Sequence, residues 1–242
     1  MDSRTVVVTG GSSGIGRAVA ARFVADGAEV VITGRRADVL KAVADEIGAR
    51  GVVCDGTDPV AVEQALTQFP ERIDVLVNNA GGNTDLVQPE PHDLSRLAAN
   101  WQANLAANVL TAVLTTTALS DRLADGGTVV LLGSIAADRG SGGGSYGAAK
   151  AALGTWNLDL SAELGARGIT SNVISPGYVA ETEFFGDRMT DERRASLLAA
   201  TRNKREGSPA DIAETVFFLA SPGARHITGQ VLNVNGGAVT TR

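Results

Sequence analysis

Short apolar runs alternate with longer segments of helical spacing over most of the chain. Seven short runs rich in Val, Ile and Leu predict strands, at Thr5–Thr9, Val30–Thr33, Val52–Cys54, Val75–Val77, Val129–Leu132, Ser171–Ile174 and Val231–Val234. Helical spacing lies between them, at Gly16–Ala25, Val39–Ile47, Val60–Phe69, Leu94–Leu123, Tyr146–Leu164 and Pro209–Ala220. Such alternation is typical of right-handed βαβ units. We therefore expect an α/β fold, a doubly wound parallel sheet of about seven strands with helices on both faces.

Two of the predicted helices have well-marked starts. Asp58-Pro59 and Ser208-Pro209 each place a capping side chain before a proline at the first helical position. Asp211 follows Ser208 by three residues, which is the spacing of a capping box. By contrast, residues 178–207 show neither strand nor helical order. Because a loop of this length is commonly functional in a compact domain, we expect a substrate-binding lid there.

Composition limits the organisation and the partners of the chain. With 242 residues, 44% of them hydrophobic, it is long enough for a full core, and we expect a single domain over residues 1–242. A formal net charge of −6 argues against a nucleic-acid partner, because clustered Lys and Arg carry that affinity. The most apolar helical stretch, Val109–Leu119, is interrupted by threonines, so we expect no membrane span.

The cysteine content and the start of the chain predict a compartment. Cys54 is the single cysteine and cannot form an internal disulfide. Met1-Asp2-Ser3-Arg4 leads directly into the first strand, with neither a basic nor an apolar leader pattern. Both observations favour the cytoplasm. The two histidines and the cysteine are far apart in sequence, so we expect no metal site.

A glycine-rich run follows the first predicted strand. It reads Thr9-Gly10-Gly11-Ser12-Ser13-Gly14-Ile15-Gly16 and lies where the strand would pass into a helix. Three of its glycines, Gly10, Gly14 and Gly16, would permit a tight turn, close backbone approach to a pyrophosphate, and close packing of the helix on the sheet. The run predicts a dinucleotide site of the Rossmann type. A flexible turn after a buried strand is the alternative.

The end of the second strand bears on which dinucleotide is bound. An acidic residue here would hold the 2′-hydroxyl of the adenosine ribose, but Gly34 takes this position and Arg35 and Arg36 follow. Two fixed positive charges suit a 2′-phosphate, so NADP(H) is favoured over NAD(H). The alternative is that both arginines solvate a surface turn. Asp55, after the third strand, is placed to accept a hydrogen bond from the adenine amino group or to stabilise a turn.

A tyrosine and a lysine lie four residues apart on the helix that begins near Ser145. Tyr146 and Lys150 therefore point from one helix face, one turn apart. A tyrosine hydroxyl has a pKa of about 10, and a neighbouring cation would lower this pKa by stabilising the phenolate, which suits proton transfer to a carbonyl. On its own, the spacing fits equally well a half-buried tyrosine beside a solvated lysine.

Five motifs occur in an order that resembles a known family. They are Thr9–Gly16, Asn78-Asn79-Ala80-Gly81, Ser134, Tyr146-Gly-Ala-Ala-Lys150 and Pro176-Gly177. The chain is similar to the short-chain dehydrogenase/reductase family, in the compact type that includes 3-oxoacyl-(acyl-carrier-protein) reductases. This resemblance runs from Thr5 to the closing segment Gly229–Gly237. It implies hydride transfer between NADP(H) and a ketone or secondary alcohol, and it leaves the substrate open.

The resemblance implies roles in the reaction for four side chains. Tyr146 would be the proton donor in reduction and the base in oxidation, and Ser134 would orient the substrate oxygen. Lys150 would lower the pKa of Tyr146 and hold the nicotinamide ribose hydroxyls. Asn108, favoured over the nearby Asn104, would keep a water in the proton relay.

A larger set is expected to bind the cofactor, from the glycine-rich loop, the ends of the second to fourth strands, the catalytic helix and the start of the lid. These residues are Gly10, Ser12, Ser13, Gly14, Ile15, Gly16, Arg35, Arg36, Asp55, Gly56, Asn79, Ala80, Gly81, Tyr146, Lys150, Pro176, Gly177, Val179 and Thr182. Asn78 is expected to stabilise the central sheet instead.

Two departures from the family pattern affect the cofactor and substrate sides. Ser134 precedes Tyr146 by 12 residues, one fewer than is usual in the fatty-acid reductases, so the glycine-rich loop Ala136–Gly144 is short and the pocket should be reshaped. Thr182 lies one place later than the threonine that commonly caps the carboxamide, and Glu181 has the usual place.

The signals for the substrate are divided. The lid carries Phe184, Phe185 and Met189 beside acids and arginines, a mixture that fits an acyl chain, a polyketide or solvent. An acyl-carrier protein is acidic and needs a basic rim, for which Arg167 is a candidate, but Asp125 lies where those reductases tend to have basic residues. The alternatives are an NAD-dependent alcohol, polyketide or sugar dehydrogenase of the same family, or a non-catalytic redox sensor that binds NADP.

The resemblance also implies assembly into a homotetramer, or a homodimer. The contacts would come from Leu94–Leu123, Tyr146–Leu164 and the C-terminal strand. The second of these helices has a stripe of small residues that would let two copies approach closely, or would pack on the chain's own sheet. They are Ala148, Ala149, Ala151, Ala152 and Gly154.

Overall fold

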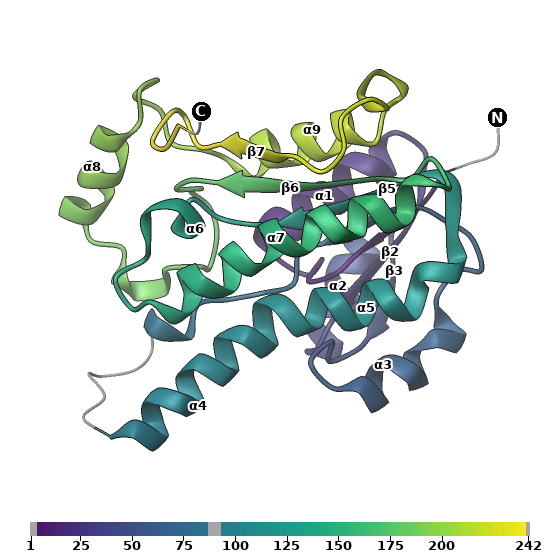
Figure 1. The fold of residues 1–242 in the computed structure, drawn as a ribbon, viewed down its shortest axis with the longest axis horizontal. Coiled ribbons are helices and arrows are strands. Elements are labelled where there is room, and N and C mark those ends of the chain that lie inside the picture. Colours follow the sequence, from purple (N-terminus) through teal and green to yellow (C-terminus); the bar gives the residue numbers. More distant parts are fainter. Residues whose placement is uncertain (1–3, 87–92, 241–242) are drawn as a thin grey trace.

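A parallel sheet of seven strands runs through the part of the chain that the computed structural model describes, residues 4–86 and 93–240 (Figure 1). The strand order is β3-β2-β1-β4-β5-β6-β7. The strands are β1 Thr5–Val8, β2 Glu29–Gly34, β3 Arg50–Val53, β4 Ile73–Asn78, β5 Leu123–Leu132, β6 Thr170–Pro176 and β7 Val231–Val234. Each of the seven predicted strands is present, and the predicted α/β fold is confirmed.

Helices cover both faces of this sheet. On one face lie α1 (Gly14–Ala25), α2 (Ala37–Ile47) and α9 (Pro209–Leu219), which bury a core against the strands. On the other face lie α3 (Pro59–Ala65), α5 (Thr111–Leu119) and α7 (Ser145–Gly165), which bury a second core. Because both faces are covered, the strands read as continuous apolar runs, and these runs located them in the sequence.

One strand is longer than the sequence indicates. The apolar run of β5 begins at Val129, but the strand begins at Leu123. The added residues include Gly126, with φ 71°, and the register against β4 shifts between Ile73 and Val75. Because this irregular, glycine-containing start lacks a continuous apolar run, the start of β5 could not be predicted from the sequence.

The predicted helix starts have the expected caps. The Asp58 side chain accepts a hydrogen bond from the Val60 N–H at 3.0 Å at the start of α3. At the start of α9, Ser208 and Asp211 form the reciprocal capping box. In both cases the local sequence determines where the helix begins.

The segment 178–207 is closed at its base. Val179 pairs with Gly207, and the Ala180 N–H donates to the Gly207 carbonyl at 2.8 Å. The sequence showed no regular structure here, whereas the structure contains a helix, α8 (Asp191–Ala200), capped by the Thr190 side chain. None of the α8 residues is buried, so its sequence lacks the apolar spacing that reveals other helices.

The predicted long helix is continuous but changes its winding. It consists of α4 (Leu94–Leu105), a π-helical segment (Ala106–Leu110), α5 and a 3₁₀ turn (Ser120–Arg122). Single π-helical turns inside α-helices occur frequently at functional sites. Here the π segment contains Asn108.

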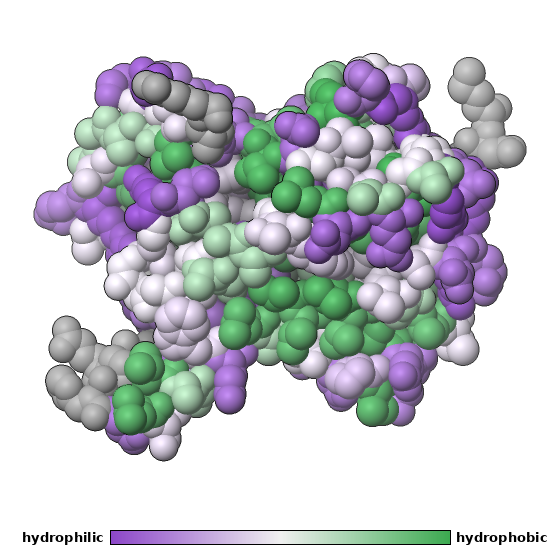
Figure 2. Space-filling view, viewed as in Figure 1, coloured by the Kyte–Doolittle hydropathy of each residue, from purple (hydrophilic) through white to green (hydrophobic). Residues whose placement is uncertain are grey.

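The expectation that no stretch could span a membrane is wrong by length and composition. The structure joins residues Leu94–Arg122 into one helical run that is apolar enough, although Val109–Leu119 alone is not. The inner face of this run packs on α3, β4 and α7, and Figure 2 shows hydrophobic residues gathered over α5 on the outer face. A helix at the core of a globular domain passes the same test as a membrane span.

The winding of the sheet places a crevice at one edge. The chain leaves β1 toward β2 on one side and β4 toward β5 on the other, so the strand order reverses between β1 and β4. In parallel α/β sheets, ligands bind outside the carboxyl ends of the strands at such a reversal. The loops after β1 and β4 are therefore the place to look for a site.

Candidate active site

A cavity of about 990 Å³ lies at the carboxyl ends of the strands. Loops after β1 to β6 and the segment 178–207 form its walls. It brings together every site residue predicted from the sequence except Gly16 and Asn108. Its volume is in the range of sites that enclose a small molecule.

Two glycines hold the loop after β1 close to its neighbours. Gly10 has φ 63°, and a Cβ on it would lie 2.9 Å from the Ala80 Cα. A Cβ on Gly16 would lie 2.3 Å from the Gly10 carbonyl oxygen. Gly16 therefore serves the packing of α1 against the loop, which is why it does not line the cavity.

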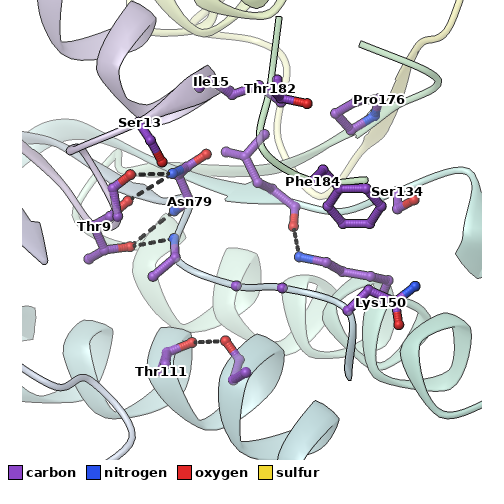
Figure 3. Close-up of a pocket in the computed structure, with 18 of the residues that line it drawn as sticks. Thr9, Ser13, Ile15, Asn79, Thr111, Ser134, Lys150, Pro176, Thr182 and Phe184 are labelled. Atoms are coloured by element: carbon purple, nitrogen blue, oxygen red, sulfur yellow. Dashed lines mark hydrogen bonds between the residues drawn. The ribbon is translucent and has the colours of Figure 1, made fainter. Parts of the chain in front are cut away.

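Hydrogen bonds join the loop after β1 to the loop after β4 (Figure 3). The Thr9 hydroxyl accepts from the backbone N–H groups of Asn79 and Ala80, both at 3.0 Å. The Asn79 side-chain amide donates to the carbonyls of Thr9 and Gly10, also at 3.0 Å. Asn78 points to the other face, where its amide donates to Thr116 of α5 at 2.8 Å. The two loops thus form one rigid floor for the cavity.

The two arginines after β2 have different surroundings. The Arg36 guanidinium lies 3.7 Å from the Glu183 carboxylate, so it is paired with the segment 178–207. For Arg35, no carboxylate of the described residues lies within ion-pair distance, and its charge helps to lower the pKa of Asp55. The main causes of that lowered pKa are the two hydrogen bonds that Asp55 Oδ1 accepts from Thr57. Asp55 thus stabilises a turn while it lines the cavity.

Ser134, Tyr146 and Lys150 meet at the other end of the cavity. Ser134 follows β5, and its hydroxyl is hydrogen-bonded to the Tyr146 side chain. Lys150 lies one turn further along α7, and its Nζ donates to the Leu132 carbonyl at 2.7 Å (Figure 3). The structure therefore places a hydroxyl pair and a cation around one point of the cavity wall.

Burial changes the acid–base properties of the tyrosine and the lysine. Desolvation raises the pKa of Tyr146 to about 12, although the hydrogen bond from Ser134 acts in the opposite direction. Desolvation also lowers the pKa of Lys150 to about 8. The sequence predicted that Lys150 lowers the Tyr146 pKa; burial raises this pKa overall, and the contribution of Lys150 stays a prediction. The Lys150 Nζ lies 5.9 Å from the Tyr146 ring centroid, and burial is the larger effect.

Asn108 holds a loop. Its side-chain amide donates to the Gly82 carbonyl at 2.7 Å and to the Asn104 carbonyl at 2.9 Å, while its Oδ1 accepts from the Gly82 N–H at 3.1 Å. A Cβ added to Gly81 would lie 2.5 Å from Asn108 Oδ1 and 3.3 Å from Lys150 Nζ. The asparagine therefore lies next to the lysine, and its side chain is committed to the loop after β4.

Aromatic residues of the segment 178–207 form a wall that leads away from Tyr146. The ring centroids of Phe184 and Tyr146 are 5.6 Å apart, and those of Phe184 and Phe185 are 4.9 Å apart. The Arg193 guanidinium lies over Phe185 at 4.8 Å. The sequence did not indicate which way these phenylalanines face, and it missed Arg193 because α8 has no apolar periodicity.

The structure contradicts the expectation that Arg167 belongs to a rim around the site. Arg167 follows α7, whose 21 residues span about 30 Å, and Tyr146 lies at the opposite end of this helix. The Arg167 guanidinium pairs with Asp125 at 2.9 Å and donates to the Ser120 carbonyl. These contacts hold the Arg167 guanidinium at the start of β5, so Arg167 is unsuited to bind a partner protein near the cavity.

Comparisons with known proteins agree with this geometry. Residues 10–239 match the family model described as enoyl-(acyl carrier protein) reductase. The chain is 37% identical over 234 residues to a Mycobacterium tuberculosis protein named as an oxidoreductase, and the match covers 97% of each chain. It is 35% identical over 245 residues to the 3-oxoacyl-(acyl-carrier-protein) reductase of Escherichia coli, covering 98% of this chain and 97% of the relative.

A solved structure of similar fold contains a nucleotide. The short chain dehydrogenase of Burkholderia cenocepacia in complex with NADP superimposes with a TM-score of 0.84. The two chains are 35% identical, and the match covers 97% of each.

The lowered pKa of Lys150 predicts a pH dependence of stability. The folded-state pKa is about 8, against an ordinary value of 10.5, so between these values the unfolded chain binds more protons. The unfolding free energy of the wild type should therefore rise with pH across this window, by about 3 kcal/mol relative to Lys150→Met. Urea unfolding of both proteins across the window measures this. Lys41→Met, at an exposed site, is the control, and parallel curves for wild type and Lys150→Met would contradict the prediction.

Proposed function

Because the chain belongs to the short-chain dehydrogenase/reductase family, we propose that it transfers a hydride between NADP(H) and a ketone or secondary alcohol. One observation carries the proposal: a single cavity joins the glycine-rich loop and Arg35 at one end to Ser134, Tyr146 and Lys150 at the other. This arrangement spans a dinucleotide and ends at groups that move a proton. The chain is an oxidoreductase of this family, and the substrate and the nucleotide are what we propose.

The residues present fit NADP(H). The Gly10–Ile15 loop packs so closely on the loop after β4 that a side chain on Gly10 would clash with it. This packing leaves the start of α1 open to a pyrophosphate. Gly34 lies against Ser12, and a Cβ added to Gly34 would lie 3.3 Å from the Ser12 Oγ. The position at which an acid would bind a 2′-hydroxyl therefore has no side chain. The charge of Arg35 lies beside this point.

In the reduction, a dinucleotide held by these residues would supply the hydride to the carbonyl carbon. Tyr146 donates its hydroxyl proton to the carbonyl oxygen, and with a pKa of about 12 it holds that proton at neutral pH. Ser134 binds the same oxygen and orients it. The buried cation of Lys150 favours the phenolate that Tyr146 leaves behind and binds the ribose hydroxyls. Asn108 keeps the loop around Gly82 in place beside Lys150 and a water of the proton relay.

The substrate that the cavity supports best is a 3-oxoacyl thioester. The apolar wall of Phe184 and Phe185 next to Tyr146 suits an acyl chain, and a relative of 35% identity is named as such a reductase. An acyl-carrier protein as the thioester carrier is not favoured, because Arg167 lies at the far end of α7. We further propose a cytoplasmic protein.

The function is tested by oxidation of NADPH and of NADH with an acetoacetyl thioester as the ketone. We expect turnover with NADPH well above that with NADH. Tyr146→Phe should lower kcat by a factor of about 100 or more, because it removes the proton donor. Tyr178→Phe is the matched control, since Tyr178 also lines the cavity and is the other tyrosine of the chain. Cofactor binding without turnover of this or other ketones would favour the redox sensor instead.

The role of Arg35 is tested by nucleotide binding. Arg35→Ala should weaken NADPH binding by a factor of about 10 to 100, the loss of a charge-assisted hydrogen bond, and leave NADH binding unchanged. Arg36→Ala should have a smaller effect, because Arg36 is already paired with Glu183. Arg72→Ala, at the start of β4, is the control. Equal losses for both nucleotides would contradict a 2′-phosphate contact.

We also propose a homotetramer, or a homodimer, assembled through α4, α5 and α7. Large apolar side chains on these helices, and on the π-helical segment between α4 and α5, are exposed, among them Trp101, Leu110 and Leu158. Leu158→Lys should reduce the mass seen by sedimentation velocity, because a buried charge would disrupt an interface. Leu158 and Val60 of α3 are 57% and 56% exposed, so Val60→Lys is a matched control. A wild type that sediments as a monomer would contradict the proposal.

A further inference from the structure

The helix that carries Tyr146 and Lys150 has no cap from its own sequence. Its N-cap residue is Gly144, with φ 85° and no side chain to accept a hydrogen bond. The first N–H groups of a helix have no partner within the helix and need an acceptor from elsewhere. Tyr146 is the second residue of α7 and lies in this first turn, which is buried.

A carboxylate from the loop after β4 supplies the acceptor. Asp85 Oδ2 accepts from the Tyr146 N–H at 3.1 Å, across 61 residues of sequence. Asp85 Oδ1 accepts from the Ser145 hydroxyl at 2.5 Å. Hydrogen bonds to a charged acceptor at a helix N-terminus are strong, because the carboxylate also interacts favourably with the helix dipole.

The same carboxylate is anchored by α4. The side-chain amides of Asn100 and Asn104 donate to Asp85 Oδ1 at 2.6 and 3.1 Å. The oxygen atoms of these two amides accept from Thr84, the neighbour of Asp85. Asn100, Asn104 and Asn108 are spaced by four residues, so one face of this helical run holds the whole loop from Gly82 to Asp85.

A glycine makes the contact sterically feasible. A Cβ added to Gly143 would lie 2.4 Å from the Asp85 Cγ. Gly143 has no left-handed φ, so its lack of a side chain serves this approach rather than the backbone conformation. The short glycine-rich loop before α7 thus brings Asp85 directly onto the start of the catalytic helix.

We propose that Asp85 is a positioning residue for Tyr146, acting as a cap in trans that fixes the first turn of α7 to the loop after β4. It does not touch the reacting atoms. Gly82 and Asn83 of the same loop line the cavity. Asp85 therefore joins the loop that lines the cofactor cavity to the helix turn that carries the proton donor. The kinetic consequence rests on the proposed function, whereas the structural one does not.

Two variants test the proposal by independent routes. Asp85→Asn keeps the shape but puts an NH₂ group where one of the two accepting oxygens was, and Gly143→Ala keeps the carboxylate but displaces it. Each should lower kcat by a factor of about 10 to 100, since small misplacements of a catalytic group have effects of this size. The Kd for NADPH should change by less than about threefold. The matched controls are Asp58→Asn, which removes a carboxylate cap from α3, and Gly165→Ala at the far end of α7.

Hydrogen exchange of the nucleotide-free proteins gives a readout that does not depend on turnover. Both variants should speed the exchange of the amides of residues 145–147, and the controls should not. Unchanged exchange there, wild-type kcat in Asp85→Asn, or faster exchange spread evenly over the whole sheet would overturn the proposal. If the wild type reduces no ketone, the proposed function fails, and the exchange data still decide whether Asp85 caps α7.

Discussion

The site depends on the contact between two loops that are about 70 residues apart in sequence. Strands β1 and β4 are neighbours in the sheet, and their ends are joined by the hydrogen bonds of Thr9 with Asn79 and Ala80. This contact fixes where the strand order reverses, and therefore where the crevice opens. The close packing of Gly10 against Ala80 and of Gly16 against Gly10 allows no side chain at either position. The floor of the cavity is thus set by backbone geometry before any charged group contributes.

Around this floor, desolvation governs the chemistry. Lys150 is held in the interior by a carbonyl, and Tyr146 is covered by Phe184, so burial moves their proton affinities apart: the pKa of Tyr146 rises and that of Lys150 falls. At neutral pH the tyrosine therefore keeps its hydroxyl proton, and the lysine releases its proton more readily than an exposed lysine does. Burial of these two polar groups lowers the stability of the fold. The two hydrophobic cores, which lie on either side of the sheet, offset this cost.

The sequence predicted the fold well because parallel strands buried on both faces leave an unmistakable apolar signal. It also predicted the helix starts at Asp58 and Ser208, where the capping partners are only two or three residues apart. It missed α8, which buries nothing, and the irregular start of β5. In the site, the glycine-rich loop, Ser134, Tyr146 and Lys150 were found because their types and spacing are distinctive.

Residues whose meaning comes from distant partners could not be found in this way. Asp85 reads as an ordinary acid in a loop, and only the fold brings it onto Ser145 and Tyr146. Arg167 reads as a basic rim residue, and the length of α7 separates it from the cavity. The rise of the Tyr146 pKa through burial could not be predicted either, because spacing along a helix reports neighbours but not burial.

The base of the segment 178–207 has a consequence for how such a protein diversifies. Its two ends lie side by side at Val179 and Gly207, so the chain between them leaves the sheet and returns to it at one place. Phe184 and Phe185 lie beside Tyr146, and none of the residues of α8 is buried. Exchanges in the chain between these ends alter the wall that a substrate touches without disturbing either core. Evolution can therefore change this segment as a unit, and with it the wall beside Tyr146, while Ser134, Tyr146 and Lys150 stay unchanged.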